Sequence, residues 1–226
     1  MELQLTDRVA IVTGAGRGVG EAIARTLATA GARIAVNDIN PDRAERVAAA
    51  IRAEGGQAVG IAADVANKFQ CVHLVETTRD QWNRLDILVN NASIRPSATI
   101  LKQDEWEWNR CLEVNLKGTF FMSQLCGRVM AEENKEQSGV IVNVASTAGV
   151  EAPLPGAAAY CASQAGIVGF ARECAREFAG YGIRVNTILR PDNTEAVTTL
   201  VLFLCSDAGR HISGSIITAN GGKIVH

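Results

Sequence analysis

Residues 9–28 read VAIVTGAGRGVGEAIARTLA. The first four side chains are apolar, which is typical of a short buried strand, and a helical pattern follows over Glu21–Ala30. Glycine occupies alternate positions of the turn between them, at residues 14, 16, 18 and 20. Because glycine has no Cβ atom, such a backbone can approach a pyrophosphate, whose charge is met by free N–H groups and the positive end of the helix. This context favours a dinucleotide-binding loop over a tight turn of purely structural use.

The second apolar run ends beside Asp38, which bears on the choice of dinucleotide. A carboxylate there is placed to accept hydrogen bonds from the adenosine ribose hydroxyls and to repel a 2′-phosphate. NAD is therefore favoured over NADP, although Arg17 and Arg33 offset part of the repulsion. An aspartate that merely caps a helix is the simpler alternative. The residues of the loop that we assign to the cofactor are Gly14, Arg17, Gly18, Val19 and Gly20.

Short apolar runs alternate with longer helical patterns along the chain. The runs are almost wholly apolar, as expected of parallel strands covered by helices on both faces. We therefore predict an α/β fold with a doubly wound parallel sheet of the Rossmann type. No linker, charge block or repeat divides residues 1–226, so one domain is expected. The predicted strands are Val9–Thr13, Arg33–Asn37, Ala58–Ala62, Ile87–Asn90, Val140–Val144, Ile183–Ile188 and Ser215–Ala219.

Composition excludes several other classes of protein. The chain has 226 residues, of which 47% are apolar and 20% charged, and a net charge of −2. This gives no electrostatic case for nucleic acid or an anionic membrane as a partner. The N-terminus lacks a leader-like apolar segment, no apolar run approaches the ~20 residues of a membrane span, and we expect a cytoplasmic protein. The six cysteines and three histidines lack the spacing of a metal site, a disulfide framework or a hydrolase centre, so no metal is predicted.

Further motifs give the chain a resemblance to the short-chain dehydrogenase/reductase family that covers essentially its whole length. They follow the glycine loop in order and are Asp64-Val65, Asn90-Asn91-Ala92, Asn115, Ser146, Tyr160 and, near the end, Ile212-Ser213-Gly214 and Asn220-Gly221-Gly222. The resemblance implies that Asp64, with Val65, contacts the adenine and that Asn90 and Ala92 line the cofactor cleft. Ser93 stands where the family has glycine, and its side chain would crowd a backbone that usually lies close to the cofactor.

The resemblance also implies a reaction: hydride transfer between nicotinamide and a carbinol carbon, joined to proton transfer by a tyrosine. Tyr160 is the candidate, and it would also border the cofactor. Ser146 would polarise the same substrate oxygen, and Asn115 would anchor a water that leads protons to solvent. A structural use of each residue alone stays the alternative.

Gln164 departs from the family pattern at the most consequential position. The family has a lysine one helical turn after the tyrosine, where it binds the nicotinamide ribose and lowers the pKa of the tyrosine. A full charge 4 Å away at an effective dielectric of ~20 contributes ~4 kcal/mol. Glutamine can hydrogen-bond ribose hydroxyls but carries no charge, so we predict retained cofactor binding with proton transfer slowed by ~10²–10⁴-fold.

A second departure is the short connection after the sixth predicted strand. Arg190-Pro191-Asp192 resembles the family's Pro-Gly site, yet the last long helix begins almost at once. The family has a mobile lid of a few tens of residues there, which covers the substrate. Either the protein lacks this lid, or the lid is missing from this sequence at Pro191–Asp192.

Two helical stretches are apolar on more than one face, and we expect them to pack against another subunit. One runs from Trp106 to Met130 and the other from Tyr160 to Ala179. Close packing within a monomer is the alternative. Three functions stay open: an NAD-dependent alcohol dehydrogenase or ketoreductase with a weakened site, on 3-hydroxyacyl or 3-oxoacyl thioesters by analogy; a non-catalytic subunit that assembles with an active, lysine-bearing paralogue; and a nucleotide-responsive regulatory protein.

Overall fold

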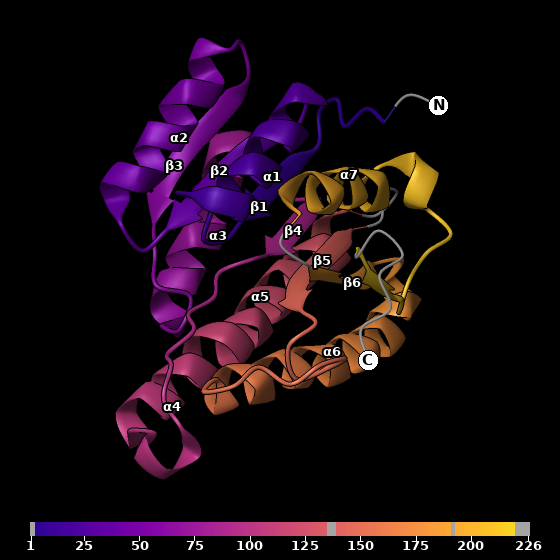
Figure 1. The fold of residues 1–226 in the computed structure, drawn as a ribbon. Coiled ribbons are helices and arrows are strands. Elements are labelled where there is room, and N and C mark those ends of the chain that lie inside the picture. Colours follow the sequence, from indigo (N-terminus) through magenta and orange to yellow (C-terminus); the bar gives the residue numbers. More distant parts are fainter. Residues whose placement is uncertain (1–2, 135–138, 191–192, 220–226) are drawn as a thin grey trace.

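Parallel strands form the centre of the molecule in the computed structural model, which describes residues 3–134, 139–190 and 193–219 (Figure 1). Within these ranges the sheet has seven strands in the order β3-β2-β1-β4-β5-β6-β7. All the strand pairs are parallel, which confirms the predicted doubly wound α/β sheet. The strands are β1 Val9–Val12, β2 Arg33–Asp38, β3 Gln57–Ala62, β4 Ile87–Asn90, β5 Val140–Ser146, β6 Arg184–Arg190 and β7 Ile216–Thr218.

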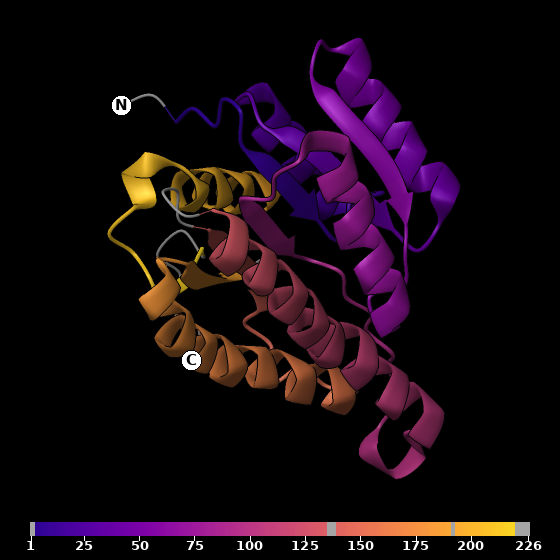
Figure 2. The ribbon, with the colours of Figure 1, turned by 180° about the vertical axis from the view of Figure 1, so that it is seen from behind.

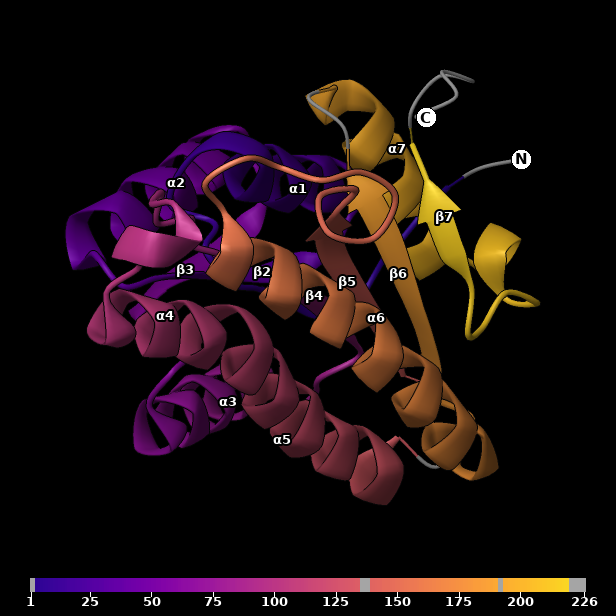
Figure 3. The ribbon, with the colours of Figure 1, turned by 60° about the horizontal axis from the view of Figure 1, so that its bottom comes forward.

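Helices cover both faces of the sheet (Figure 3). On one face lie α1 Gly18–Thr29, α2 Pro41–Ala53 and α7 Thr194–Cys205. On the other lie α3 Lys68–Trp82, α5 Gly118–Glu133 and α6 Ala158–Phe178, seen side by side from behind in Figure 2. Helix α4 Glu105–Leu112 runs through a π-helical turn, Glu113–Lys117, directly into α5. Short 3₁₀ turns occupy Ile100–Lys102, Ala179–Tyr181 and Asp207–Gly209.

The two covered faces explain why the strands lack alternating polarity. In β1 all four residues are buried. Ala10 and Val12 belong to the core shared with α1, α2 and α7, whereas Val9 and Ile11 belong to the core shared with α3, α5 and α6. Because side chains alternate between faces and both faces are dry, every position of the strand favours an apolar residue.

The strand order reverses between β1 and β4, and this reversal positions the candidate site. From β1 the chain continues to β2 and β3 on one side of the sheet, and from β4 it continues to β5, β6 and β7 on the other. The segments after the two strands diverge, which opens a crevice at the carboxyl edge, where ligands of such sheets bind. The strand predictions agree with the structure within one or two residues. Both β5 and β6 run two residues further than predicted, to Ser146 and Arg190, which are register neighbours at this edge.

Candidate functional site

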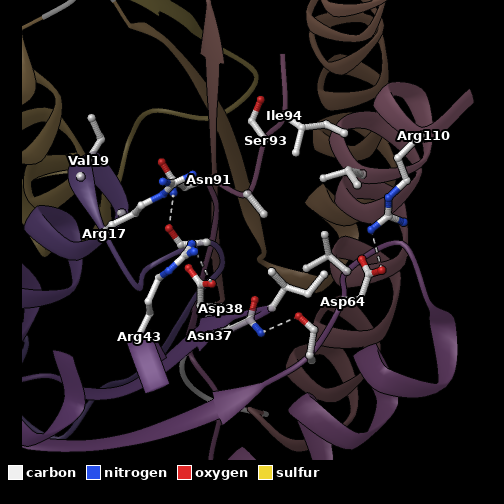
Figure 4. A pocket seen from close by; sticks show the side chains of 18 of the residues that line it. Arg17, Val19, Asn37, Asp38, Arg43, Asp64, Asn91, Ser93, Ile94 and Arg110 are labelled. Atoms are coloured by element: carbon white, nitrogen blue, oxygen red, sulfur yellow. Dashed lines mark hydrogen bonds and ion pairs between the residues drawn. The ribbon is translucent and has the colours of Figure 1, made fainter. Parts of the chain in front are cut away.

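A cavity of about 460 Å³ lies in this crevice (Figure 4). Its walls come from the glycine turn and the start of α1, the segments after β2 and β3, residues 91–94 after β4, Arg110 and Val114 on the α4–α5 run, and Arg190 at the end of β6. Five separate strand ends therefore contribute to one site. All the predicted loop residues line it, namely Gly14, Arg17, Gly18, Val19 and Gly20.

Helix α1 begins at the cavity without a side-chain cap. The α1 N-cap residue, Arg17, makes no side-chain capping hydrogen bond. The helices α2, α3, α4 and α7 each have a capping side chain that accepts a backbone N–H, namely Asn40, Asn67, Asp104 and Asn193. Helix α6 also begins without a side-chain cap, but its residues do not line the cavity. An anion is the natural partner of an uncapped helix N-terminus, because the first N–H groups and the helix dipole both attract it.

Two glycines of the turn are required for different reasons. At Gly14 a Cβ atom would lie 2.8 Å from the Cα of Ala92, and φ is +61°, so both packing and conformation demand glycine. At Gly18 φ is +59°, yet a Cβ atom would meet nothing within 4 Å. The space above Gly18 is thus open and faces the cavity, as a site for a pyrophosphate requires.

Asp38 lies at the carboxyl end of β2 with its side chain nearly buried. One carboxylate oxygen accepts the backbone N–H of Gly16 at 3.2 Å, and the other accepts that of Asn40 at 2.9 Å. The helix-capping alternative for Asp38 is wrong, because the N-cap of α2 is Asn40. Arg43 approaches the same carboxylate only to 3.9 Å. The carboxylate borders the cavity and is held rigidly by the glycine turn.

Asp64 and Val65, which follow β3, also line the cavity. Asp64 pairs with Arg110 of α4, whose Nη2 lies 2.7 Å from its carboxylate oxygen (Figure 4). Arg110 was not predicted as a site residue, and no local pattern could have revealed it, because Asp64 and Arg110 are 46 positions apart. The ion pair ties the wall after β3 to α4.

Two adjacent asparagines lie at the end of β4, and Asn91, the first residue after the strand, lines the cavity. Its Nδ2 donates to the carbonyl oxygens of Thr13 and Gly14 at 3.0 and 3.1 Å, which fixes the glycine turn. Asn90, which we expected at the cofactor cleft, is buried, and its Nδ2 donates to Ser123 and Asn143. The Asn90 side chain therefore holds neighbouring elements together instead of bordering the cavity.

Ala92 and Ser93 line the cavity as well. Ser93 is exposed, and its φ lies outside the left-handed region, so the backbone there does not demand the family's glycine. Its hydroxyl adds a polar group to the wall next to Ile94.

Tyr160 lies in the first turn of α6 and is 6% exposed. It packs in a small cluster with Cys111 of α4 and with Ala148. Ala148 lies two residues after Ser146, the last residue of β5. The Tyr160 hydroxyl makes no hydrogen bond with any described residue and is not among the fully enclosed polar atoms. The Ser146 hydroxyl accepts the backbone N–H of Ala148 at 3.1 Å. The Tyr160 hydroxyl is therefore free to bind an oxygen of a ligand.

Asn115 and Gln164 are joined through Ser163. The Nδ2 of Asn115 donates to the Ser163 hydroxyl at 2.9 Å, and that hydroxyl donates to the carbonyl of Tyr160 at 2.7 Å. Gln164, 2% exposed, contacts the same hydroxyl through its Nε2 at 3.4 Å. Asn115 also holds both backbone groups of Ile94, at 2.8 and 2.9 Å. This network, of which the sequence analysis missed Ser163, fixes α6 against the segment after β4.

The π-helical turn explains how Asn115 reaches this network. The N–H of Gly118 bonds to Glu113, five residues back, and the Asn115 carbonyl is taken instead by the Thr119 hydroxyl at 2.7 Å. Single π turns inside α-helices are frequent at functional sites.

Ser146, Asn115, Tyr160 and Gln164 do not line the cavity, but they adjoin its residues. Asn115 bonds to Ile94, and Ser146 is the register neighbour of Arg190. The structure thus gathers these four residues beyond the β4–β6 end of a nucleotide-sized cavity.

A model of the family described as short chain dehydrogenase matches residues 8–199 of the chain. The chain belongs to this family. Its curated relatives include a 3-oxoacyl-[acyl-carrier-protein] reductase of Synechocystis sp., 34% identical, with 98% of each chain covered. A D-threitol dehydrogenase of Mycolicibacterium smegmatis is 36% identical, with 99% of this chain and 95% of that protein covered. Such different names indicate that the family shares a reaction type and not one substrate.

A solved structure of a 7α-hydroxysteroid dehydrogenase, complexed with NADH and 7-oxo glycochenodeoxycholic acid, superposes on this short chain dehydrogenase with a TM-score of 0.92. The two sequences are 30% identical, and the match covers 100% of this chain and 97% of the other. The alignment with the Synechocystis reductase spans 247 positions, more than the 226 residues of this chain. That relative therefore has residues at positions where this chain has none.

The described residues, 3–134, 139–190 and 193–219, also bear on other classes of site. None of their helices combines the length and the apolar character needed to cross a bilayer. Among the same residues, no three His, Cys, Asp or Glu side chains come together as metal ligands. The predicted Pro191–Asp192 junction and the Asn220-Gly221-Gly222 motif lie outside the described residues.

Proposed function

We propose that this short chain dehydrogenase binds NAD(H) in the cavity and interconverts an alcohol and a ketone only weakly by itself. The observation that carries the proposal is the uncapped start of α1 opening onto the cavity at Gly18, with the Asp38 carboxylate at one end of the same cavity. Together they fit a pyrophosphate followed by an adenosine ribose. The preference for NAD over NADP follows from charge, because the Asp38 carboxylate would repel a 2′-phosphate.

The dinucleotide, when bound, would supply or accept the hydride. The chain would supply the proton chemistry. The free hydroxyl of Tyr160 would donate its proton to the substrate oxygen during reduction, and Ser146 would hydrogen-bond the same oxygen. Gln164 carries no charge to favour the tyrosinate, and it lies buried beside Ser163. The weak step is thus proton transfer, whereas cofactor binding is preserved.

The substrate is proposed at the level of its class. The named relatives act on an acyl-carrier-protein thioester, a sugar alcohol and a steroid, which share a secondary alcohol or the matching ketone. We propose the same functional group for this chain, with 3-hydroxyacyl and 3-oxoacyl thioesters as the first compounds to test.

A second function is a non-catalytic subunit that assembles with a lysine-bearing paralogue. A groove of about 550 Å³ favours it, because the groove lies on the outer side of α4, α5 and α6 and has an apolar lining of Leu112, Leu116, Phe120 and Phe170. The rings of Phe120 and Phe170 meet edge to face, with centroids 6.1 Å apart. An exposed aromatic groove of this kind is typical of a subunit interface.

Calorimetric titration with NADH and NADPH tests the proposed cofactor, with Asp38→Asn as the informative variant and Asp42→Asn, on the exposed start of α2, as its control. We expect wild type and Asp42→Asn to prefer NADH, and Asp38→Asn to shift the ratio of the two Kd values toward NADPH by about tenfold or more. A wild-type protein that binds neither dinucleotide contradicts the proposal.

Native mass spectrometry on protein from its own cells separates the two functions. A homo-oligomer that reduces ketones slowly supports the weak enzyme. A complex with a second, lysine-bearing subunit that holds all the turnover supports the non-catalytic role.

A further inference from the structure

Arg190 is the last residue of β6 and lines the cavity, although the reaction described above gives it no role. It pairs in register with Ser146, and paired residues of neighbouring parallel strands send their side chains to the same face of the sheet. Val144, two residues before Ser146, belongs to the core under α1 and α7. The Arg190 side chain therefore emerges on the face where α1 begins.

The charges around the cavity are unevenly paired. Four guanidinium groups and two carboxylates line it. Arg110 pairs with Asp64 at 2.7 Å, and Arg43 approaches Asp38 at 3.9 Å. Within the described part of the chain, Arg17 and Arg190 have no hydrogen bond or ion pair through their side chains. Two cations without an acidic partner among the described residues therefore line the cavity that the glycine turn also borders.

The place of Arg190 along the sheet separates it from Arg17. The residues that fit adenosine follow β2 and β3, and the glycine turn follows β1, whereas Arg190 ends β6 on the opposite side of the strand reversal. In such sheets the two halves of a dinucleotide lie on either side of that reversal. Arg190 thus belongs with the nicotinamide half and lies on the β6 side of the strand reversal, whereas the glycine turn follows β1.

We infer that Arg190 binds the pyrophosphate of the dinucleotide from the β6 side, so that α1 and Arg190 hold it between them. The planar guanidinium presents parallel donors that match phosphate oxygens, and a half-buried site strengthens the interaction. The cavity gains at Arg190 a positive charge on the nicotinamide side, where Gln164 supplies none. This inference rests on the proposed NAD(H) binding.

The test compares Arg190→Gln and Arg190→Lys with wild type, using NADH, ADP-ribose and AMP as probes in calorimetric titrations. Arg210→Gln, which removes an exposed cation far along the chain from the cavity, is the matched control. Hydrogen bonds to charged groups contribute roughly 1.5–3 kcal/mol, so we expect Arg190→Gln to weaken NADH and ADP-ribose by about 10–100-fold. The affinity for AMP, which lacks the second phosphate, should decrease by less than about threefold in the same variant.

The affinity of Arg190→Lys for NADH should lie between those of wild type and Arg190→Gln, since lysine keeps the positive charge but lacks the parallel donors of the guanidinium. The melting temperature of both Arg190 variants should match that of wild type, because the Arg190 side chain has no hydrogen bond or ion pair with another residue that the structure describes. An Arg190→Gln protein that binds NADH as wild type does overturns the inference and leaves the proposed function standing. If Arg190→Gln weakens the binding of AMP and of NADH equally, Arg190 does not lie on the nicotinamide side of the pyrophosphate. A wild-type protein without NADH binding contradicts the proposed function itself.

Discussion

Gln164 follows Tyr160 by one turn of α6, so the two side chains share a face of the helix. Gln164→Lys should restore a cation beside the tyrosine and raise kcat for NADH-dependent ketone reduction by ~10²–10⁴-fold. Steady-state absorbance of NADH measures this effect. Gln164→Met, which is similar in length and uncharged, is the control and should stay slow. If Gln164→Lys binds NADH yet reduces ketones no faster than Gln164→Met, the missing charge is not the defect.

Cys71 provides a test of burial through pH. Burial in α3 raises the pKa of its thiol from 9.0 to about 12, and the Asp64 charge adds to the rise. Above pH 9 the unfolded chain therefore releases a proton that the folded chain keeps, so the free energy of unfolding decreases as pH rises from 9 toward 12. Urea unfolding at pH 7 and pH 10 should show a loss that is smaller in Cys71→Ala than in wild type, by up to about 1.4 kcal/mol. The same loss in both proteins would mean that this thiol ionises freely in the folded state.

At the scale of elements, we propose that the glycine turn and α1 bind the pyrophosphate as one unit. Gly18 and Gly55 offer a matched pair, because both have positive φ, +59° and +87°, and open space at the Cβ position, but only Gly18 lines the cavity. Alanine in the left-handed region costs roughly 1–2 kcal/mol, so Gly18→Ala and Gly55→Ala should lower the free energy of unfolding similarly. Only Gly18→Ala should weaken NADH binding, by about tenfold or more, because its methyl group occupies the approach to the N–H groups. Equal NADH affinities in the two variants would place the pyrophosphate elsewhere.

The elements themselves could be predicted from the sequence, since strands covered on both faces must be apolar throughout. The start of α1 was predicted at Glu21 but lies at Gly18, so the helix includes the last residues of the glycine turn. The π turn at Asn115 has no sequence signature, and only the bonds of Asn115 to Ile94 and Ser163 account for it. Local pattern fixes which element a residue belongs to, whereas these contacts depend on how distant elements meet.

The candidate site could be predicted only in part. Residues that follow strands, such as Asp38 and Asp64, are recognisable because every parallel strand ends at the same edge. Arg110 was missed, and Asn91 was quoted in its motif but given no role of its own, because the partners of both residues come from other elements. Asn90 and Asn91 are neighbours in a motif, and only the direction in which each side chain points decides which one reaches the cavity.

For the whole molecule, the structure narrows the face expected to meet another subunit. Ile167, Val168 and Ala171 of the α6 stripe are buried within the chain itself, so the wide apolar pattern is largely explained without a partner. Phe120 and Phe170 remain accessible at the groove. Phe170→Glu should reduce the mass measured by light scattering during size exclusion. Leu101→Glu is the control, because Leu101 is 95% exposed and outside the groove. An unchanged mass in Phe170→Glu would exclude the groove as the interface.

Helix α4 is one short element shared by two sites. Arg110 faces the cavity, where it holds Asp64, whereas Asn109 and Leu112 face the groove. A nucleotide in the cavity and a neighbouring subunit in the groove would therefore each immobilise the same two turns. The conformational entropy of α4 would be lost in the first binding event only. Each ligand would therefore raise the affinity for the other by the same factor. We expect the subunit dissociation constant to fall when NADH is present, and an identical constant with and without NADH would show that the two sites are energetically independent.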